Sequence, residues 1–131
     1  MLVVDSSLLL SSLLPDEAGP DLEELFDSYD EVTAPWLLWV ELRNILLVAE
    51  RRGRLPAGSA EEILEVIDEL GIALDQTPRS ASVMRLARRH DLSAYDALYL
   101  ELALHRDATL ATLDQRLQKA AAAEGVRLAV G

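Results

Sequence analysis

Short apolar runs alternate with longer stretches of helical periodicity along this chain. The run Leu2-Val3-Val4 is apolar, two of its residues are β-branched, and Asp5 follows it directly. Runs of this kind are typical of short buried strands. We predict strands over residues 1–5, 31–34, 72–74, 109–112 and 126–130, and helices over residues 8–15, 21–28, 36–52, 57–70, 79–90, 94–106 and 114–124.

This alternation predicts the fold class. Strands that alternate with helices favour an α/β domain with a mostly parallel sheet that helices cover on both faces. No linker, repeat or low-complexity tract interrupts residues 1–131, which predicts a single domain. In open sheets of this type ligands bind in the crevice beyond the carboxyl ends of the strands. Asp5 lies at such an end.

Composition narrows the function classes. The 131 residues include no cysteine, which excludes disulfides, zinc–thiolate sites and cysteine nucleophiles. The first apolar run is too short to span a membrane and lacks the features of a signal peptide, so we expect a cytoplasmic protein with no membrane partner. A net charge of −11 argues against a general nucleic-acid coat. It leaves open an enzyme whose clustered acids bind a metal.

Two acids follow predicted strands. Asp5 comes directly after the first strand, and Asp114 comes just after the strand at 109–112. Each also precedes a predicted helix, so an N-cap is the alternative role for both, because aspartate favours that position. If the two strands are neighbours in a parallel sheet, both carboxylates lie at the same edge.

Two further acids lie on strongly apolar helices. The neighbours of Glu41 at helical spacing are apolar, and burial of an unpaired carboxylate is costly. The alternative role for Glu41 is a structural ion pair with an arginine. Asn44, one helical turn later, is a candidate hydrogen-bond donor to its carboxylate. Asp96 follows Ser93 by three residues, which also resembles a capping box. We expect Glu101, on another face of the Asp96 helix, to be exposed.

Together these acids indicate metal chemistry. Carboxylates held close together raise one another's pKa values unless a cation neutralises them. Oxygen ligands without histidine or cysteine suit Mg²⁺ or Mn²⁺. Such an ion can activate a water for attack on a phosphodiester, and no side-chain nucleophile is then required.

The motifs around these acids resemble the PIN domain, and within it the VapC toxins of bacterial toxin–antitoxin pairs. The matching stretches are VVDSS at residues 3–7, ELRN at 41–44, SAYDALYL at 93–100 and LATLD at 110–114. The resemblance covers the chain in order and spacing. It implies a three-layer α/β/α fold with a central, mostly parallel sheet of about five strands.

The resemblance also implies an activity, a site and partners. The activity is that of a Mg²⁺- or Mn²⁺-dependent endoribonuclease, with RNA as substrate. Asp5, Glu41, Asp96 and Asp114 are the implied metal-binding and catalytic acids, and Ser6, Asn44 and Thr112 are the implied supporting residues. A homodimer and a VapB-type antitoxin are the implied partners. Arg116 stands where some family members carry a fifth acid.

Three other functions compete with this one. A phosphate-accepting receiver domain needs a lysine after a late strand, but the only lysine, Lys119, lies within a predicted helix. A phosphatase of the Asp-x-Asp type is disfavoured because Ser6 and Ser7 follow Asp5. A PIN-like module that only binds its ligand is the non-enzymatic alternative, and the complete set of four acids argues against it.

Overall fold

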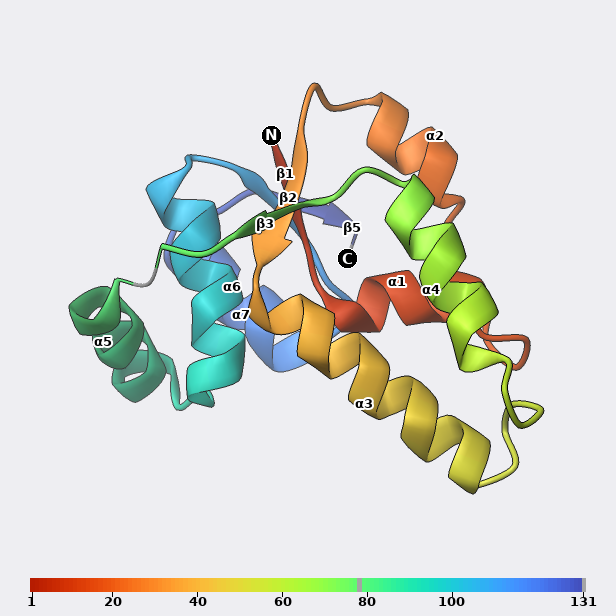
Figure 1. The fold of residues 1–131 in the computed structure, drawn as a ribbon. Helices are drawn as coiled ribbons and strands as arrows, with labels where there is room; N and C mark the ends of the chain where they lie inside the picture. The colour runs from red at the N-terminus through yellow and green to blue at the C-terminus, as the bar shows by residue number, and fades with distance from the viewer. Residues whose placement is uncertain (78, 131) are drawn as a thin grey trace.

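The computed structural model describes residues 1–77 and 79–130, and every predicted strand and helix has a counterpart in it (Figure 1). The strands are β1 (Leu2–Val4), β2 (Val32–Pro35), β3 (Ala73–Asp75), β4 (Thr109–Ala111) and β5 (Leu128–Val130). The helices are α1 (Ser6–Leu13), α2 (Leu22–Asp27), α3 (Leu37–Arg51), α4 (Ala60–Glu69), α5 (Ser80–His90), α6 (Ala94–His105) and α7 (Gln115–Ala123).

Several boundaries differ from the prediction, among them the end of α1 at Leu13, the start of β5 at Leu128 and the starts of two helices. Helix α1 begins two residues earlier than expected, at Ser6, because the Asp5 side chain caps it. Helix α4 begins three residues later, at Ala60. The preceding turn holds Gly58 at φ +85°, a left-handed conformation that glycine adopts without a steric penalty.

The sheet has five strands in the order β3-β2-β1-β4-β5, and every neighbouring pair is parallel. The chain builds β1, β2 and β3 outward in one direction and then returns to place β4 on the other side of β1. The β1–β4 boundary is therefore the topological switch point, where α/β sheets bind their ligands. The three-layer α/β/α class is confirmed.

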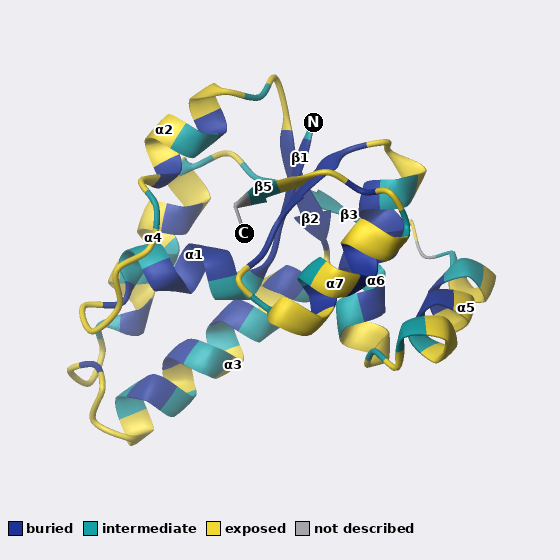
Figure 2. Cartoon of the chain, turned by 180° about the vertical axis from the view of Figure 1, so that it is seen from behind, coloured by how far each residue is buried: buried dark blue, intermediate teal, exposed yellow. Residues whose placement is uncertain are grey.

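Helices cover both faces of the sheet. In Figures 1 and 2, α1, α2 and α4 lie on one side and α5, α6 and α7 on the other. Strand β1 is completely buried, as Figure 2 shows. A strand buried on both faces needs a continuous apolar sequence rather than an alternating one, which accounts for Leu2-Val3-Val4.

Helix α6 lies at the centre of its layer. It packs against β1, β2 and β4 and also against α5 and α7. A helix with neighbours on several sides is apolar around most of its circumference, as α6 is from Ala97 to Ala103. Within the described residues, none of the helices is long and apolar enough to cross a membrane.

Candidate active site at the carboxyl edge of the sheet

Asp5 occupies the switch point. It is the N-cap of α1, and its carboxylate is buried. Oδ1 accepts hydrogen bonds from the backbone N–H of Leu8 at 3.1 Å and from the Ser7 hydroxyl at 2.7 Å. Oδ2 accepts from the Thr112 hydroxyl, at the end of the neighbouring strand β4. Asp5 is therefore both a helix cap and a link between the ends of two strands.

Thr112 and Ser7 fix the segment that carries Asp114. The backbone N–H of Asp114 donates to Thr112 Oγ1 at 3.0 Å, and that of Leu113 donates to Ser7 Oγ at 3.1 Å. The Asp114 carboxylate caps α7 by accepting from the backbone N–H groups of Arg116 and Leu117, at 2.9 and 3.1 Å. The N-cap alternative is thus correct for Asp5 and Asp114, and it also orients both carboxylates.

Glu41 comes from α3 and is half-buried. Its Oε1 accepts a hydrogen bond of 2.5 Å from the hydroxyl of Tyr99 on α6. Burial raises the pKa of Glu41 above its ordinary value, and the negative charges of Asp5 and Asp96 add to the rise. Among the described residues no arginine pairs with Glu41, so the ion-pair alternative is wrong.

Asp96 lies in the first turn of α6, where its backbone N–H donates to Ser93 Oγ at 3.1 Å. The capping interaction predicted for Ser93 is therefore confirmed. Burial raises the pKa of the Asp96 carboxyl, and the charge of Asp114 raises it further. The hydrogen bond with Ser93 and the positive charge of Arg116 act in the opposite direction.

The four acids form one electrostatic group. The charge of Asp114 acts on Asp5 and Asp96, and the charges of Asp5 and Asp96 act on Glu41. Burial raises the pKa of Asp5 as well, against the hydrogen bonds that stabilise its charge. Four carboxylates from four different elements thus meet beyond the ends of β1 and β4. Their mutual repulsion is the condition that a bound cation relieves.

The donor set fits a hard divalent cation because it consists of carboxylate oxygens. Over residues 1–77 and 79–130, however, no three histidine, aspartate or glutamate side chains converge closely enough to hold a metal as they stand. Mg²⁺ is commonly held by one or two carboxylates and several waters, a ligand set that these acids can supply.

Comparison with known proteins identifies the fold family. The family model described as "PIN domain" matches residues 2–123. The chain belongs to the PIN-domain family. It is 32% identical to Ribonuclease VapC3 of Pyrobaculum aerophilum over 120 residues, which cover 88% of this chain and 91% of that protein. The resemblance to the VapC group is confirmed.

Solved structures agree with this assignment. The crystal structure of PAE2754 from Pyrobaculum aerophilum has a TM-score of 0.72 and 25% identity, over 91% of this chain and 83% of that one. The crystal structure of FitAcB from Neisseria gonorrhoeae has a TM-score of 0.66 and 21% identity, over 98% and 96% of the two chains. At that identity the second likeness shows the fold alone.

The predicted supporting residues of this PIN domain have different surroundings. Thr112 is fully buried and donates to Asp5, as described above. Ser7, rather than Ser6, is the serine that donates to Asp5. Asn44 is exposed, and its part in the site stays a prediction, as does that of Ser6. Ser7 could have been predicted from its place two residues after a capping aspartate, because a hydroxyl there can donate to the aspartate carboxylate.

Arg116 lies at the rim of the PIN-domain site. Its charge acts on Asp96, while its guanidinium donates to the backbone carbonyl oxygen of Asp91 at 2.7 Å and to the Asp91 carboxylate at 3.2 Å. Its side chain is largely exposed. The structure thus places a cation, rather than a fifth acid, at this position.

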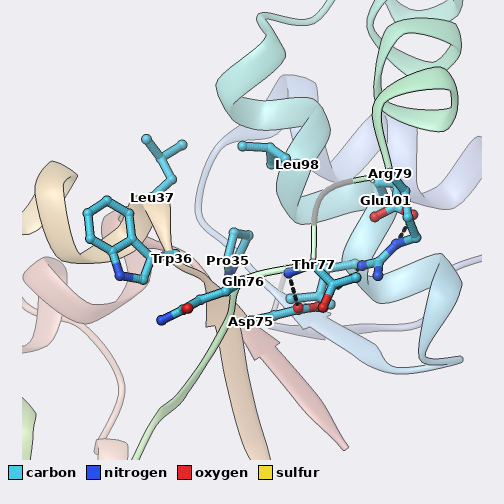
Figure 3. A pocket seen from close by; sticks show the side chains of 10 residues that line it. Pro35, Trp36, Leu37, Asp75, Gln76, Thr77, Arg79, Leu98 and Glu101 are labelled. Carbon is cyan, nitrogen blue, oxygen red and sulfur yellow. Dashed lines mark hydrogen bonds and ion pairs between the residues drawn. The ribbon is translucent and has the colours of Figure 1, made fainter.

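The expectation that Glu101 is exposed is wrong. Its side chain is buried, and it accepts a hydrogen bond of 2.5 Å from Arg79 Nε (Figure 3). Arg79 also bonds to Asp75 at the end of β3, at 3.2 Å. This Asp75–Arg79–Glu101 triad lines a pocket of ≈ 530 Å³, to which the start of α3 and one side of α6 also contribute.

Proposed function

We propose that this PIN domain is an endoribonuclease of the VapC type, which acts in the cytoplasm as the toxin of a toxin–antitoxin pair. The observation that carries the proposal is the group of four interacting acids, Asp5, Glu41, Asp96 and Asp114, at the switch point of the sheet. The similarity to a protein named Ribonuclease VapC3 supports the choice of RNA as substrate.

The proposed cofactor is Mg²⁺ or Mn²⁺, held by the four acids. When bound, such an ion lowers the pKa of a water molecule and stabilises negative charge that develops on a phosphate. Carboxylates have to be ionised to bind it, so binding competes with protons. Because the pKa values of Asp5, Glu41 and Asp96 are all raised, this competition should extend above the pH range of ordinary carboxyl groups.

The protein's own groups prepare the site in distinct ways. Thr112, Ser7 and the Leu8 N–H donate hydrogen bonds that favour the ionised form of Asp5 and hold it in one orientation. The α7 N-terminus holds Asp114 by two backbone hydrogen bonds. Arg116 places a positive charge at the rim, where an RNA phosphate approaching the acids would meet it. The acids thus supply the metal site, and Arg116 supplies one phosphate contact.

Metal removal tests the proposal. We expect purified, antitoxin-free protein to cut total cellular RNA into discrete fragments with Mg²⁺ or Mn²⁺ and to leave the RNA intact in EDTA. Titration with Mn²⁺ at several pH values should show binding that still tightens as the pH rises above the ordinary carboxyl range, because the pKa values of Asp5, Glu41 and Asp96 are raised. Gel analysis of the RNA and calorimetry of Mn²⁺ binding provide the two measurements.

Two outcomes would contradict the proposal. Cleavage that persists in EDTA would exclude a metal-dependent nuclease. Binding of RNA and Mn²⁺ without any cleavage would favour the binding-only module instead.

The proposed partners are a second copy of the chain and a VapB-type antitoxin. Helix α3 and the residue before it expose a stripe of large apolar side chains: Trp36, Trp39, Val40 and Leu47. Trp36 and Trp39 stack with ring centroids 5.8 Å apart, and the Arg43 guanidinium covers Trp39. Exposed apolar stripes of this kind mark protein interaction sites.

Substitution of Val40 by glutamate tests the homodimer. The added charge would be buried without a partner at an interface, so we expect sedimentation velocity to show a dimer for the wild type and a monomer for Val40→Glu. The exposed residue Val66 on α4 provides the control, because Val66→Glu adds the same charge outside the α3 stripe. A monomeric wild-type protein would contradict the homodimer.

A further inference from the structure

Tyr99 is a buried tyrosine with a polar partner in the candidate active site. Its side chain is 1% exposed, and it lies within the apolar stretch of α6. A buried phenol hydroxyl needs a hydrogen-bond partner, because an unpaired one costs free energy. The partner here is the carboxylate of Glu41 on another helix, 58 positions earlier in the sequence, at 2.5 Å.

The two acids at strand ends accept hydrogen bonds from the backbone. Asp5 and Asp114 cap helices, so backbone N–H groups hold their carboxylates. Glu41 lies inside α3, where the backbone N–H groups are already bonded within the helix. A side chain from elsewhere therefore has to orient it, and Tyr99 fills that position.

The place of Tyr99 on α6 adds a geometric reason. It follows Asp96 by three residues, so the two side chains lie on the same face of the helix, one turn apart. Helix α6 thus presents its own carboxylate and, next to it, the hydroxyl that holds the carboxylate of α3. The hydroxyl bonds to Oε1, and no described residue donates a hydrogen bond to the second oxygen of Glu41.

We propose that Tyr99 is a positioning residue that keeps the Glu41 carboxylate turned toward the other acids, so that it can serve as a metal ligand. This inference rests on the proposed function, since it assigns Tyr99 a part in the same site. Without the hydroxyl, repulsion from Asp5 and Asp96 would turn Glu41 toward solvent. The metal would then have to restore the geometry that Tyr99 provides beforehand.

The test is the Tyr99→Phe protein, which lacks only the hydroxyl. We expect calorimetry with Mn²⁺ to show binding about 10–100-fold weaker than in the wild type, the usual effect of removing a residue that orients a metal ligand. The Mn²⁺ concentration for half-maximal RNA cleavage should rise by a similar factor, while the rate at saturating Mn²⁺ changes less. Tyr29→Phe removes a hydroxyl outside the site and should leave both quantities unchanged.

A double-mutant cycle separates positioning from general disturbance of the structure. If Tyr99 acts through Glu41, Tyr99→Phe should weaken Mn²⁺ binding much less in a Glu41→Gln background than in the wild type. Equal losses in the two backgrounds would overturn the proposal. Glu41→Asp provides a second route should Tyr99→Phe not fold, because its shorter side chain draws back from the hydroxyl. Wild-type Mn²⁺ affinity in Glu41→Asp would also overturn it.

The two measurements distinguish this inference from the proposed function. If the wild type binds Mn²⁺ but cuts no RNA, the nuclease proposal fails, and the calorimetric comparison still decides the role of Tyr99. If the wild type cuts RNA and Tyr99→Phe has the same Mn²⁺ dependence, the nuclease proposal stands and the role of Tyr99 is overturned.

Discussion

The Asp96→Asn protein should fold normally and lose RNA cleavage by at least about a hundredfold, because removal of a metal-ligand charge exceeds the 10–100-fold effect of altering its surroundings. Asparagine has nearly the same shape as aspartate. The backbone N–H of residue 96 still donates to Ser93, so the start of α6 is preserved. The loss would thus follow from the missing negative charge, and initial rates of RNA cleavage at saturating Mn²⁺ measure it.

The same substitution should stabilise the metal-free protein slightly. The pKa of Asp96 is raised in the folded state above its ordinary value of 3.8. Its ionised form therefore lowers the stability of the protein at pH values above 3.8. Asparagine removes that cost, and the melting temperature at pH 7 should rise. The gain should disappear as the pH falls below 3.8, where Asp96 is protonated in both the folded and the unfolded protein. Opposite changes in activity and stability are characteristic of a functional site.

Asp27→Asn is the matched control, because it removes an exposed aspartate charge at the end of α2. It should leave the rate of RNA cleavage unchanged. Equal rates for Asp96→Asn and the wild type would show that the four acids do not act together in cleavage.

Arg79→Ala should lower the free energy of unfolding by about 3 kcal/mol, toward the lower end of the range for breaking a buried ion pair. The change leaves Glu101, whose side chain is 7% exposed, without its cation, and it removes the ion pair with Asp75. The Arg79 side chain is itself 20% exposed, so water can replace part of what it contributes. Urea unfolding followed by circular dichroism measures the effect.

Arg54 provides the comparison for this experiment. It pairs with Asp16 and Glu17, but all three side chains are more than 40% exposed, so Arg54→Ala should cost much less stability than Arg79→Ala. Replacement of the inner pair together, as Arg79→Met with Glu101→Leu, should recover part of the loss, because Glu101 then leaves no unpaired charge, while Asp75 keeps only its hydrogen bond from the backbone N–H of Thr77. Equal losses for Arg79→Ala and Arg54→Ala would show that the inner triad is not effectively buried.

The sequence was sufficient to predict the elements and that the four acids lie near one another, but not how all of them are held. The common location of Asp5 and Asp114 could be predicted because the carboxyl ends of parallel strands meet at one edge of the sheet. The order of the strands could not be predicted, since alternation of strands and helices is compatible with several orders. The contact between Tyr99 and Glu41 depends on that order, because it joins helices far apart in the sequence.

Glu101 shows a second limit, which arises from helix α6 itself. An amphipathic helix reveals its inward face by the position of its polar residues. Helix α6 has few polar residues, so its sequence does not show which face points inward. A lone glutamate in such a helix is therefore assigned to the solvent side. Arg79, the cation that makes the burial of Glu101 possible, lies in the connection between β3 and α5, 22 residues earlier.

The link between Asp5 and Thr112 has a consequence for synthesis of the protein. The two residues are 107 positions apart, and the acid after Thr112 completes the group of four. Domains fold during translation only as their segments leave the ribosome, N-terminal parts first. A nascent chain therefore carries Asp5 and Glu41 long before it can assemble the site. Such an enzyme would stay harmless to the RNA of the ribosome that makes it until the segment with Thr112 and Asp114 has been synthesised and has emerged, and an antitoxin would be needed only from that moment.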